Sequence, residues 1–174
     1  MPERVAVLDV GSNAVRLVLA RVTPGVEFRV LCQERVQTRL AGNRRGLLPR
    51  AAVDQTIRAV RRFLAEVRRR GSPRVIAVAT AAVRDAPNAD RLLGTLRGEA
   101  GVDVRVLSGP EEARLGATAV LWSRPISRGA IVDLGGGSLQ VTRVREGRIA
   151  RVASVPLGGG VKAPSVLLLA RATR

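Results

Sequence analysis

The chain has 174 residues, of which 46% are apolar and 2% aromatic, so valine, leucine and alanine must fill its core. The absence of histidine and the presence of one cysteine exclude a Ser-His-Asp triad, a His-ligated zinc site and an internal disulfide. The formal net charge of +16 favours a polyanionic partner, although an arginine-rich composition explains the same number. Because no aromatic residues are interleaved with the arginines, we expect no specific nucleic-acid partner.

The sequence favours a cytoplasmic location. No run of about 18 uncharged apolar residues suggests a membrane span, and the N-terminal residues lack the pattern of a signal peptide. The lone cysteine, Cys32, fits a reducing compartment. We therefore expect a cytoplasmic protein with no membrane partner.

Apolar patterns along the chain predict an α/β fold. Strands are expected where apolar residues alternate or run continuously, at 4–9, 14–22, 26–36, 75–80, 102–107, 129–133, 138–145 and 148–155. Helices are expected where apolar residues recur every three or four positions, at 50–70, 88–100 and 110–122. The apolar stripe of the first helix consists of Val53, Ile57, Val60, Leu64 and Val67.

The order of these elements is βββαβαβα followed by a second βββ. It predicts an internal duplication with an unfinished second copy, a first domain over 1–126 and a partial second domain over 127–174. The pattern is lost after about Lys162, so we expect a truncated or fragmentary reading frame. The glycine tract at 158–160 in this region suits either a further phosphate contact or a plain loop.

Two glycine-rich turns, each led by an aspartate, carry most of the functional information. They are DVGSN at Asp9–Asn13 and DLGGGS at Asp133–Ser138, and each lies between two strand patterns, which is typical of a β-hairpin. Glycine lets the backbone approach a ligand closely, and successive N–H groups in such a turn bind anions. An aspartate at a strand end can hold a cation. The pair of turns therefore predicts a phosphate site.

Four motifs, in order, resemble those of the exopolyphosphatase and guanosine pentaphosphate phosphohydrolase (Ppx/GppA) family of the actin-like ATPase superfamily. The motifs are VAVLDVGSNAVRLVLARV, VIAVATAAVRDAPNAD, VLSGPEEARLGA and AIVDLGGGSLQV. The resemblance implies two ribonuclease-H-like lobes with the active site between them, of which this chain holds one lobe and the start of the other. It also implies Mg²⁺-assisted release of phosphate from inorganic polyphosphate, or of the 5′-phosphate from pppGpp, and a homodimer for full-length members.

The resemblance also assigns roles to individual residues. Glu112 matches the catalytic glutamate, and Asp9 and Asp133 are expected to hold the metal. The positions expected to bind phosphate are Gly11, Ser12, Asn13, Arg84, Gly135, Gly136 and Ser138. These roles agree with the chemistry, because attack on a phosphoanhydride needs a group that orients or activates water, cationic charge and fixed N–H donors.

Each of these residues also has a plainer explanation. Glu111 and Glu112 suit the first turn of a helix for electrostatic reasons alone, Arg84 suits a solvated surface, and Gly135–Gly137 suits an ordinary turn. Gln140 departs from the family, which carries a glutamate at this position. Glutamine is neutral and cannot act as a base, so we expect weak activity if that carboxylate helps to hold magnesium.

Three functions follow from the sequence. The first is a phosphoanhydride hydrolase of this family, with Glu112 positioning or activating the water. The alternatives are a catalytically inactive fragment that binds polyphosphate or nucleotide, and a kinase or ATPase of the same superfamily. Nothing in the sequence separates polyphosphate from pppGpp as the substrate.

Overall fold

The computed structural model of the chain describes residues 2–23, 25, 27–41, 46–71, 73–156 and 165–169. The chain divides into two compact units, Met1–Val106 and Leu107–Arg174, here called unit 1 and unit 2. Among the described residues, no helix has both the length and the apolar character needed to cross a membrane. The glycine tract at 158–160 lies outside the described residues.

Unit 1 is built on a five-stranded mixed sheet in the order β3-β2-β1-β4-β5. Its strands are β1 (Glu3–Val10), β2 (Ala14–Thr23), β3 (Glu27–Gln37), β4 (Arg74–Ala79) and β5 (Val104–Val106). β2 pairs antiparallel with both β1 and β3, whereas β1, β4 and β5 run parallel to one another. The first three strands thus form the predicted meander, and the parallel strands extend it.

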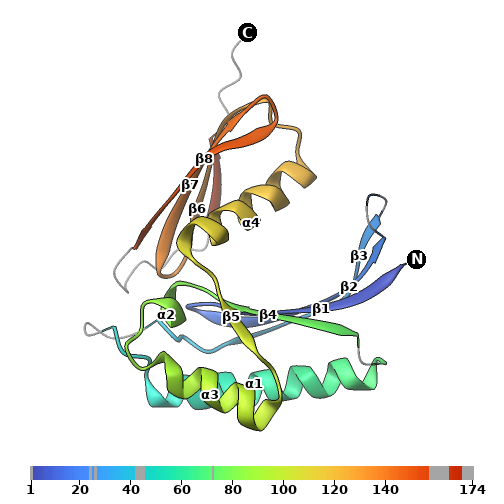
Figure 1. Cartoon of the computed structure of the whole chain (residues 1–174), viewed down its shortest axis with the longest axis vertical. Helices are drawn as coiled ribbons and strands as arrows, with labels where there is room; N and C mark the ends of the chain where they lie inside the picture. Colours follow the sequence, from blue (N-terminus) through green and yellow to red (C-terminus); the bar gives the residue numbers. More distant parts are fainter. Residues whose placement is uncertain are drawn as a thin grey trace. The chain divides into compact units, whose positions relative to one another are not determined.

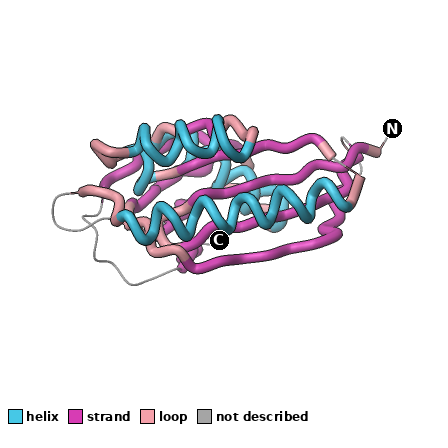
Figure 2. The backbone as a smooth tube through the Cα atoms, turned by 90° about the horizontal axis from the view of Figure 1, so that it is seen from below, coloured by secondary structure: helices cyan, strands magenta, loops and turns pink. Residues whose placement is uncertain are grey.

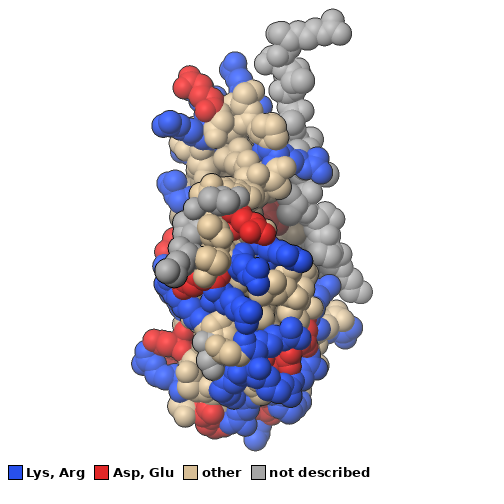
Figure 3. Space-filling model, turned by 90° about the vertical axis from the view of Figure 1, so that its right-hand side faces the viewer, with Lys and Arg blue, Asp and Glu red and all other residues tan. Residues whose placement is uncertain are grey.

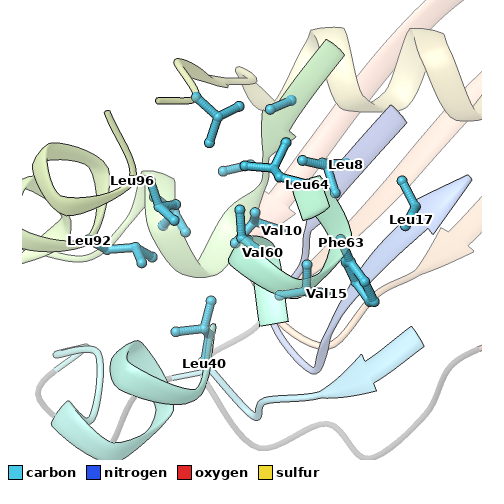
Figure 4. Close-up of a cluster of buried hydrophobic side chains, with 14 of the residues drawn as sticks. Leu8, Val10, Val15, Leu17, Leu40, Val60, Phe63, Leu64, Leu92 and Leu96 are labelled. Atoms are coloured by element: carbon cyan, nitrogen blue, oxygen red, sulfur yellow. The ribbon is translucent and has the colours of Figure 1, made fainter. Parts of the chain in front are cut away.

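Helices α1 (Arg50–Arg69), α2 (Ala81–Arg84) and α3 (Ala89–Ala100) connect the strands of unit 1. α1 and α3 lie next to each other on one face of the sheet (Figures 1 and 2). The predicted apolar stripe of α1 is confirmed, since four of its residues are buried and the fifth, Ile57, packs against the core. Phe63 adds a fully buried ring, which lies near Leu17 and Val15 of β2 (Figure 4).

Unit 2 consists of a helix on one face of a second sheet. Its elements are α4 (Gly109–Ser123), β6 (Arg128–Leu134), β7 (Ser138–Arg145), β8 (Arg148–Pro156) and β9 (Ser165–Leu169). The strand order is β8-β7-β6-β9, with β6 antiparallel to both of its neighbours. A small apolar core made of Ala117, Ile126, Ile131 and Val144 lies between the helix and the sheet.

The structure differs from the sequence predictions in two respects. α4 packs on the second sheet, so the contacts divide the chain after Val106 and not at the predicted 126/127 boundary. The C-terminal region, where the sequence pattern is lost after about Lys162, includes one further strand, β9, which pairs with β6 over residues 165–169. β9 occupies the place beside β6 that β4 occupies beside β1, but it runs in the opposite direction.

Candidate functional site

The first glycine turn joins β1 to β2 and is held from two sides. The Gly11 N–H donates to the Ala14 carbonyl oxygen at 3.1 Å, and a Cβ on Gly11 would lie 3.1 Å from that same oxygen. The turn therefore needs glycine at this position. Backbone N–H groups of the segment after β3 donate to the carbonyl oxygens of Ser12 (2.7 Å, from Ala41) and Asn13 (3.0 Å, from Thr38). These bonds fix the backbone of the turn.

Asp9, which leads the first turn, lies next to an arginine on the neighbouring strand. Its side chain retains 33% exposure and forms an ion pair with Arg16 at 3.6 Å. Burial raises the pKa of the Asp9 carboxyl, and the positive charge of Arg16 opposes that rise without cancelling it. A further cation nearby would therefore stabilise the ionised form of the Asp9 carboxylate.

Asp9 also lies in a row of charged residues that crosses the sheet of unit 1. The strand register sets Arg35, Arg16, Asp9, Val78 and Arg105 side by side on β3, β2, β1, β4 and β5. Because side chains alternate along a strand and the residues flanking Asp9 are in the core, this row lies on the face opposite α1 and α3. Three arginines in one row make this face attractive to a polyanion.

Arg84 lies at the same edge of the sheet as the first turn. β4 runs parallel to β1, with Ala79 paired to Val10, and the Thr80 N–H donates to the Val10 carbonyl oxygen at 3.4 Å. The short helix α2 begins directly afterwards and ends with Arg84, whose guanidinium contacts Asp85 at 3.2 Å. The Arg84 side chain is 20% exposed.

The second glycine turn, between β6 and β7, is closed in the same way as the first. The Gly135 N–H donates to the Ser138 carbonyl oxygen at 2.8 Å, and a Cβ on Gly135 would lie 3.3 Å from that oxygen. Asp133 leads this turn and pairs across the strands with Gln140, as Asp9 pairs with Arg16. The two hairpins are therefore equivalent, as the predicted duplication requires.

Behind the second turn, the face of β7 that α4 covers is polar. Ser138, Gln140 and Thr142 alternate along the strand and are 1%, 3% and 1% exposed. Gln140 Nε2 donates to Ser138 Oγ at 2.6 Å, and Thr142 Oγ1 donates to the Ala113 carbonyl oxygen of α4 at 3.5 Å. Gln140 Oε1 is buried without a hydrogen-bond partner among the described residues. A buried acceptor without a partner is unusual in a core and calls for an explanation, such as a ligand or an ion.

The two glutamates at the start of α4 are in different situations. Glu111 completes a capping box, because its carboxylate accepts from the Ser108 N–H at 2.8 Å while the Ser108 hydroxyl accepts from the Glu111 N–H at 3.3 Å. Glu112 follows in the same first turn, and its backbone N–H donates to the Ser108 carbonyl oxygen at 2.9 Å. The structure therefore gives Glu111 a capping role at the start of α4, and the catalytic role of Glu112 stays a prediction.

Two glycines set α4 close against the sheet. A Cβ on Gly109 would lie 2.6 Å from the Cβ of Ser154 on β8, and a Cβ on Gly116 would lie 3.6 Å from Oδ2 of Asp133 on β6. Ser154, Gln140 and Asp133 are aligned across the three strands. The seven residue steps from Gly109 to Gly116 span about 10.5 Å of helix, close to the ~9.6 Å of two strand spacings.

The middle of this helical stretch therefore passes over β7, at Gln140. Ala113 and Ala117 lie on the side of the apolar core, where Ala117 packs in the small cluster and Ala113 is buried. Glu112 is one helical turn before Gly116, so both lie on the side of α4 near Asp133. Unit 2 thus brings Glu112, Asp133, Gln140 and the second turn together.

Each unit gathers one group of predicted residues. Unit 1 sets Arg84 at the same sheet edge as Asp9 and the first turn, and unit 2 gathers the remainder. The sequence did not identify Arg16, Thr142 or Ser154 as neighbours of these groups. The polar alternation S-x-Q-x-T at 138–142 was the available signal, because a covered strand face is normally apolar. No group of three or more His, Cys, Asp or Glu side chains suited to a metal occurs among the described residues.

Comparisons with known proteins agree with this arrangement. A profile of the Ppx/GppA phosphatase family matches residues 18–166. Exopolyphosphatase 1 of Mycobacterium tuberculosis is 34% identical over 161 residues, which cover 90% of this chain and 47% of that protein. The crystal structure of an Aquifex aeolicus member of the Ppx/GppA family is 30% identical with a TM-score of 0.78, covering 91% of this chain and 52% of that one.

The fold prediction is confirmed by the same comparisons. An exopolyphosphatase from Cytophaga hutchinsonii has a TM-score of 0.82 at 26% identity, over 90% of this chain and 51% of that one. The α/β fold of this chain is therefore the ribonuclease-H-like, actin-like ATPase fold of these proteins. The chain spans about half the length of the curated relatives it matches. Since the family match extends over most of its residues, the chain belongs to the Ppx/GppA phosphatase family.

Proposed function

We propose that this chain carries the phosphate-handling part of a hydrolase that releases phosphate from inorganic polyphosphate or the 5′-phosphate from pppGpp. The observation that supports it best is the pair of equivalent hairpins, each with an aspartate leading a glycine turn closed by the same backbone hydrogen bond. Backbone turns of this kind bind anions. The row of Arg35, Arg16 and Arg105 adds attraction for a long polyanion, as do the basic side chains spread over the face in Figure 3.

In this proposal Glu112 orients and deprotonates the attacking water. The water oxygen forms a bond to the terminal phosphorus, the bond from that phosphorus to the bridging oxygen breaks, and the water proton passes to the Glu112 carboxylate. Glu112 suits this role because the capping of α4 already uses its neighbour Glu111. Each glycine turn, with Arg84 beside the first, offers donors to phosphate oxygens.

The residues present suit Mg²⁺. Asp9 in unit 1 and Asp133 in unit 2 each supply carboxylate oxygens, the type of ligand that Mg²⁺ prefers. Mg²⁺ is commonly held by one or two carboxylates together with waters and substrate phosphates, so a larger acidic cluster is not required. When bound, the ion would offset the negative charge of the phosphoryl oxygens.

Phosphate release from polyphosphate, pppGpp and ATP, each with and without Mg²⁺, tests the proposal. We expect Glu112→Gln to lower the rate about 100-fold or more, since it removes the group that accepts the proton. Glu111→Gln is the matched control and should retain the rate, because a glutamine can still close the capping box. Equal rates for the two variants would overturn the role of Glu112, and faster turnover of ATP would favour the kinase or ATPase alternative.

A homodimer is part of the same proposal. Light scattering coupled to size-exclusion chromatography of the 174-residue chain measures the oligomeric state directly, and a monomer at all concentrations would contradict the homodimer.

A further inference from the structure

The buried pair formed by Gln140 and Ser138 has hydrogen-bonding capacity that nothing in the described structure uses. Ser138 Oγ accepts from Gln140 Nε2 at 2.6 Å, so the hydroxyl proton must point elsewhere. Gln140 Oε1 is a buried acceptor with no donor among the described residues. The pair therefore leaves three groups unused, the Ser138 hydroxyl donor, the second N–H of Gln140 Nε2 and the acceptor Oε1, in side chains that are 1% and 3% exposed.

The position of the pair points to its ligand. Ser138 Oγ lies 3.9 Å from the place where a Cβ on Gly135 would be, which sets the hydroxyl at the closing end of the second glycine turn. Gln140 is aligned across the strands with Asp133 on one side and Ser154 on the other. Buried donors and acceptors without a hydrogen-bond partner destabilise the folded chain. A ligand that bonds to both the Ser138 hydroxyl and Gln140 Oε1 recovers that free energy.

We propose that this pair selects a protonated phosphate, the hydrogen phosphate ion, at the second turn. An unprotonated oxygen of that ion accepts from the Ser138 hydroxyl, and its P–O–H group donates to Gln140 Oε1. Sulfate has nearly the same size and shape, but at neutral pH it carries no proton and leaves Oε1 unpaired. Gln140 is thus a specificity-determining residue for the anion, and it acts on the phosphate that hydrolysis would release. The inference rests on the proposed function for its biological meaning, but its binding test does not depend on turnover.

Calorimetric titration of the whole chain with inorganic phosphate and with sulfate, at pH 7 and equal ionic strength, tests this inference. We expect phosphate to bind at least about 10-fold more tightly than sulfate, since sulfate leaves a buried acceptor unsatisfied. Gln140→Met keeps the length of the side chain but removes both polar atoms, so the preference should fall to about 1. Gln33→Met, at an exposed glutamine of β3, is the matched control and should retain the preference.

The ratio of the two affinities separates recognition from a structural role, because loss of folding weakens both anions equally. Ser138→Ala should weaken both anions and keep phosphate ahead of sulfate, since Gln140 Oε1 remains. Wild-type binding without preference, an unchanged ratio in Gln140→Met, or no binding of either anion would each overturn the inference. Failure of the proposed function looks different: phosphate is then preferred over sulfate, but no phosphate is released from polyphosphate or pppGpp.

Discussion

Replacing Gly109 by alanine should loosen α4 from its sheet. The added Cβ would lie 2.6 Å from both Cβ and Oγ of Ser154, closer than carbon and oxygen atoms approach without a shift of the backbone. Overpacking of this kind typically costs 1–3 kcal/mol, and the better helix propensity of alanine returns at most about 1 kcal/mol. We therefore expect a net loss of up to about 2 kcal/mol.

Hydrogen exchange read by mass spectrometry is the suitable assay, because it reports on α4 separately from unit 1. A loss of up to about 2 kcal/mol makes the α4 amides that exchange through detachment of the helix exchange up to about 30-fold faster. Adding Ser154→Gly removes both clashing atoms, so the double variant should regain most of the protection that Gly109→Ala loses relative to the Ser154→Gly parent. Gly94→Ala in α3 is the control: a Cβ there meets nothing within 4 Å, so it should stabilise by about 0.5–1 kcal/mol. Unchanged exchange of α4 in Gly109→Ala, or no rescue by Ser154→Gly, would refute the close packing that brings Glu112 beside Asp133.

Three further predictions follow from burial and backbone conformation. Burial raises the pKa of Asp9 in the folded state, so the folded chain binds this proton more tightly and loses stability as the pH rises from the unfolded value of about 4 through the raised one. Asp9→Asn should therefore gain stability relative to wild type above that interval but not below it, and urea unfolding from pH 3 to 8 that gives parallel curves would contradict this. Phe63→Ala should cost about 3–5 kcal/mol of unfolding free energy, because the ring is fully buried; a loss below 1 kcal/mol would mean that the core collapses around the gap. Gly101→Ala should cost about 1 kcal/mol in urea unfolding, since Gly101 ends α3 with a φ of 66°, and an unchanged midpoint would argue against that conformation.

The sequence predicted the order of unit 1 well because its periodicities are unambiguous. The strands around Asp9 alternate cleanly, and the stripe of α1 repeats at helical spacing over about four turns. α2 was not predicted, because its four residues are too few to show a periodic pattern. The two glycine turns were predictable from composition, because a Cβ at Gly11 or Gly135 would lie only 3.1 or 3.3 Å from a backbone oxygen, which favours glycine at both positions.

The location of α4 could not be predicted from its pattern. Its closest approaches to the second sheet are made by small residues, Gly109, Ala113, Gly116 and Ala117, which give a weak amphipathic signal. Their importance depends on how closely two backbones approach, which is a property of the folded pair and not of either segment. For the same reason the hydrogen bond between Gln140 and Ser138 could be seen only with the side chains in place.

The equivalence of the two hairpins ends at the residue across from the aspartate. The residue across from Asp9 carries a guanidinium, Arg16, while the residue across from Asp133 carries an amide, Gln140. The two hairpins thus differ in the charge beside the aspartate, while the hydrogen bond that closes the turn is the same. Each hairpin can therefore serve as the control for the other. Exchanging the residues at positions 16 and 140 would show how the group opposite the aspartate changes the properties of each turn.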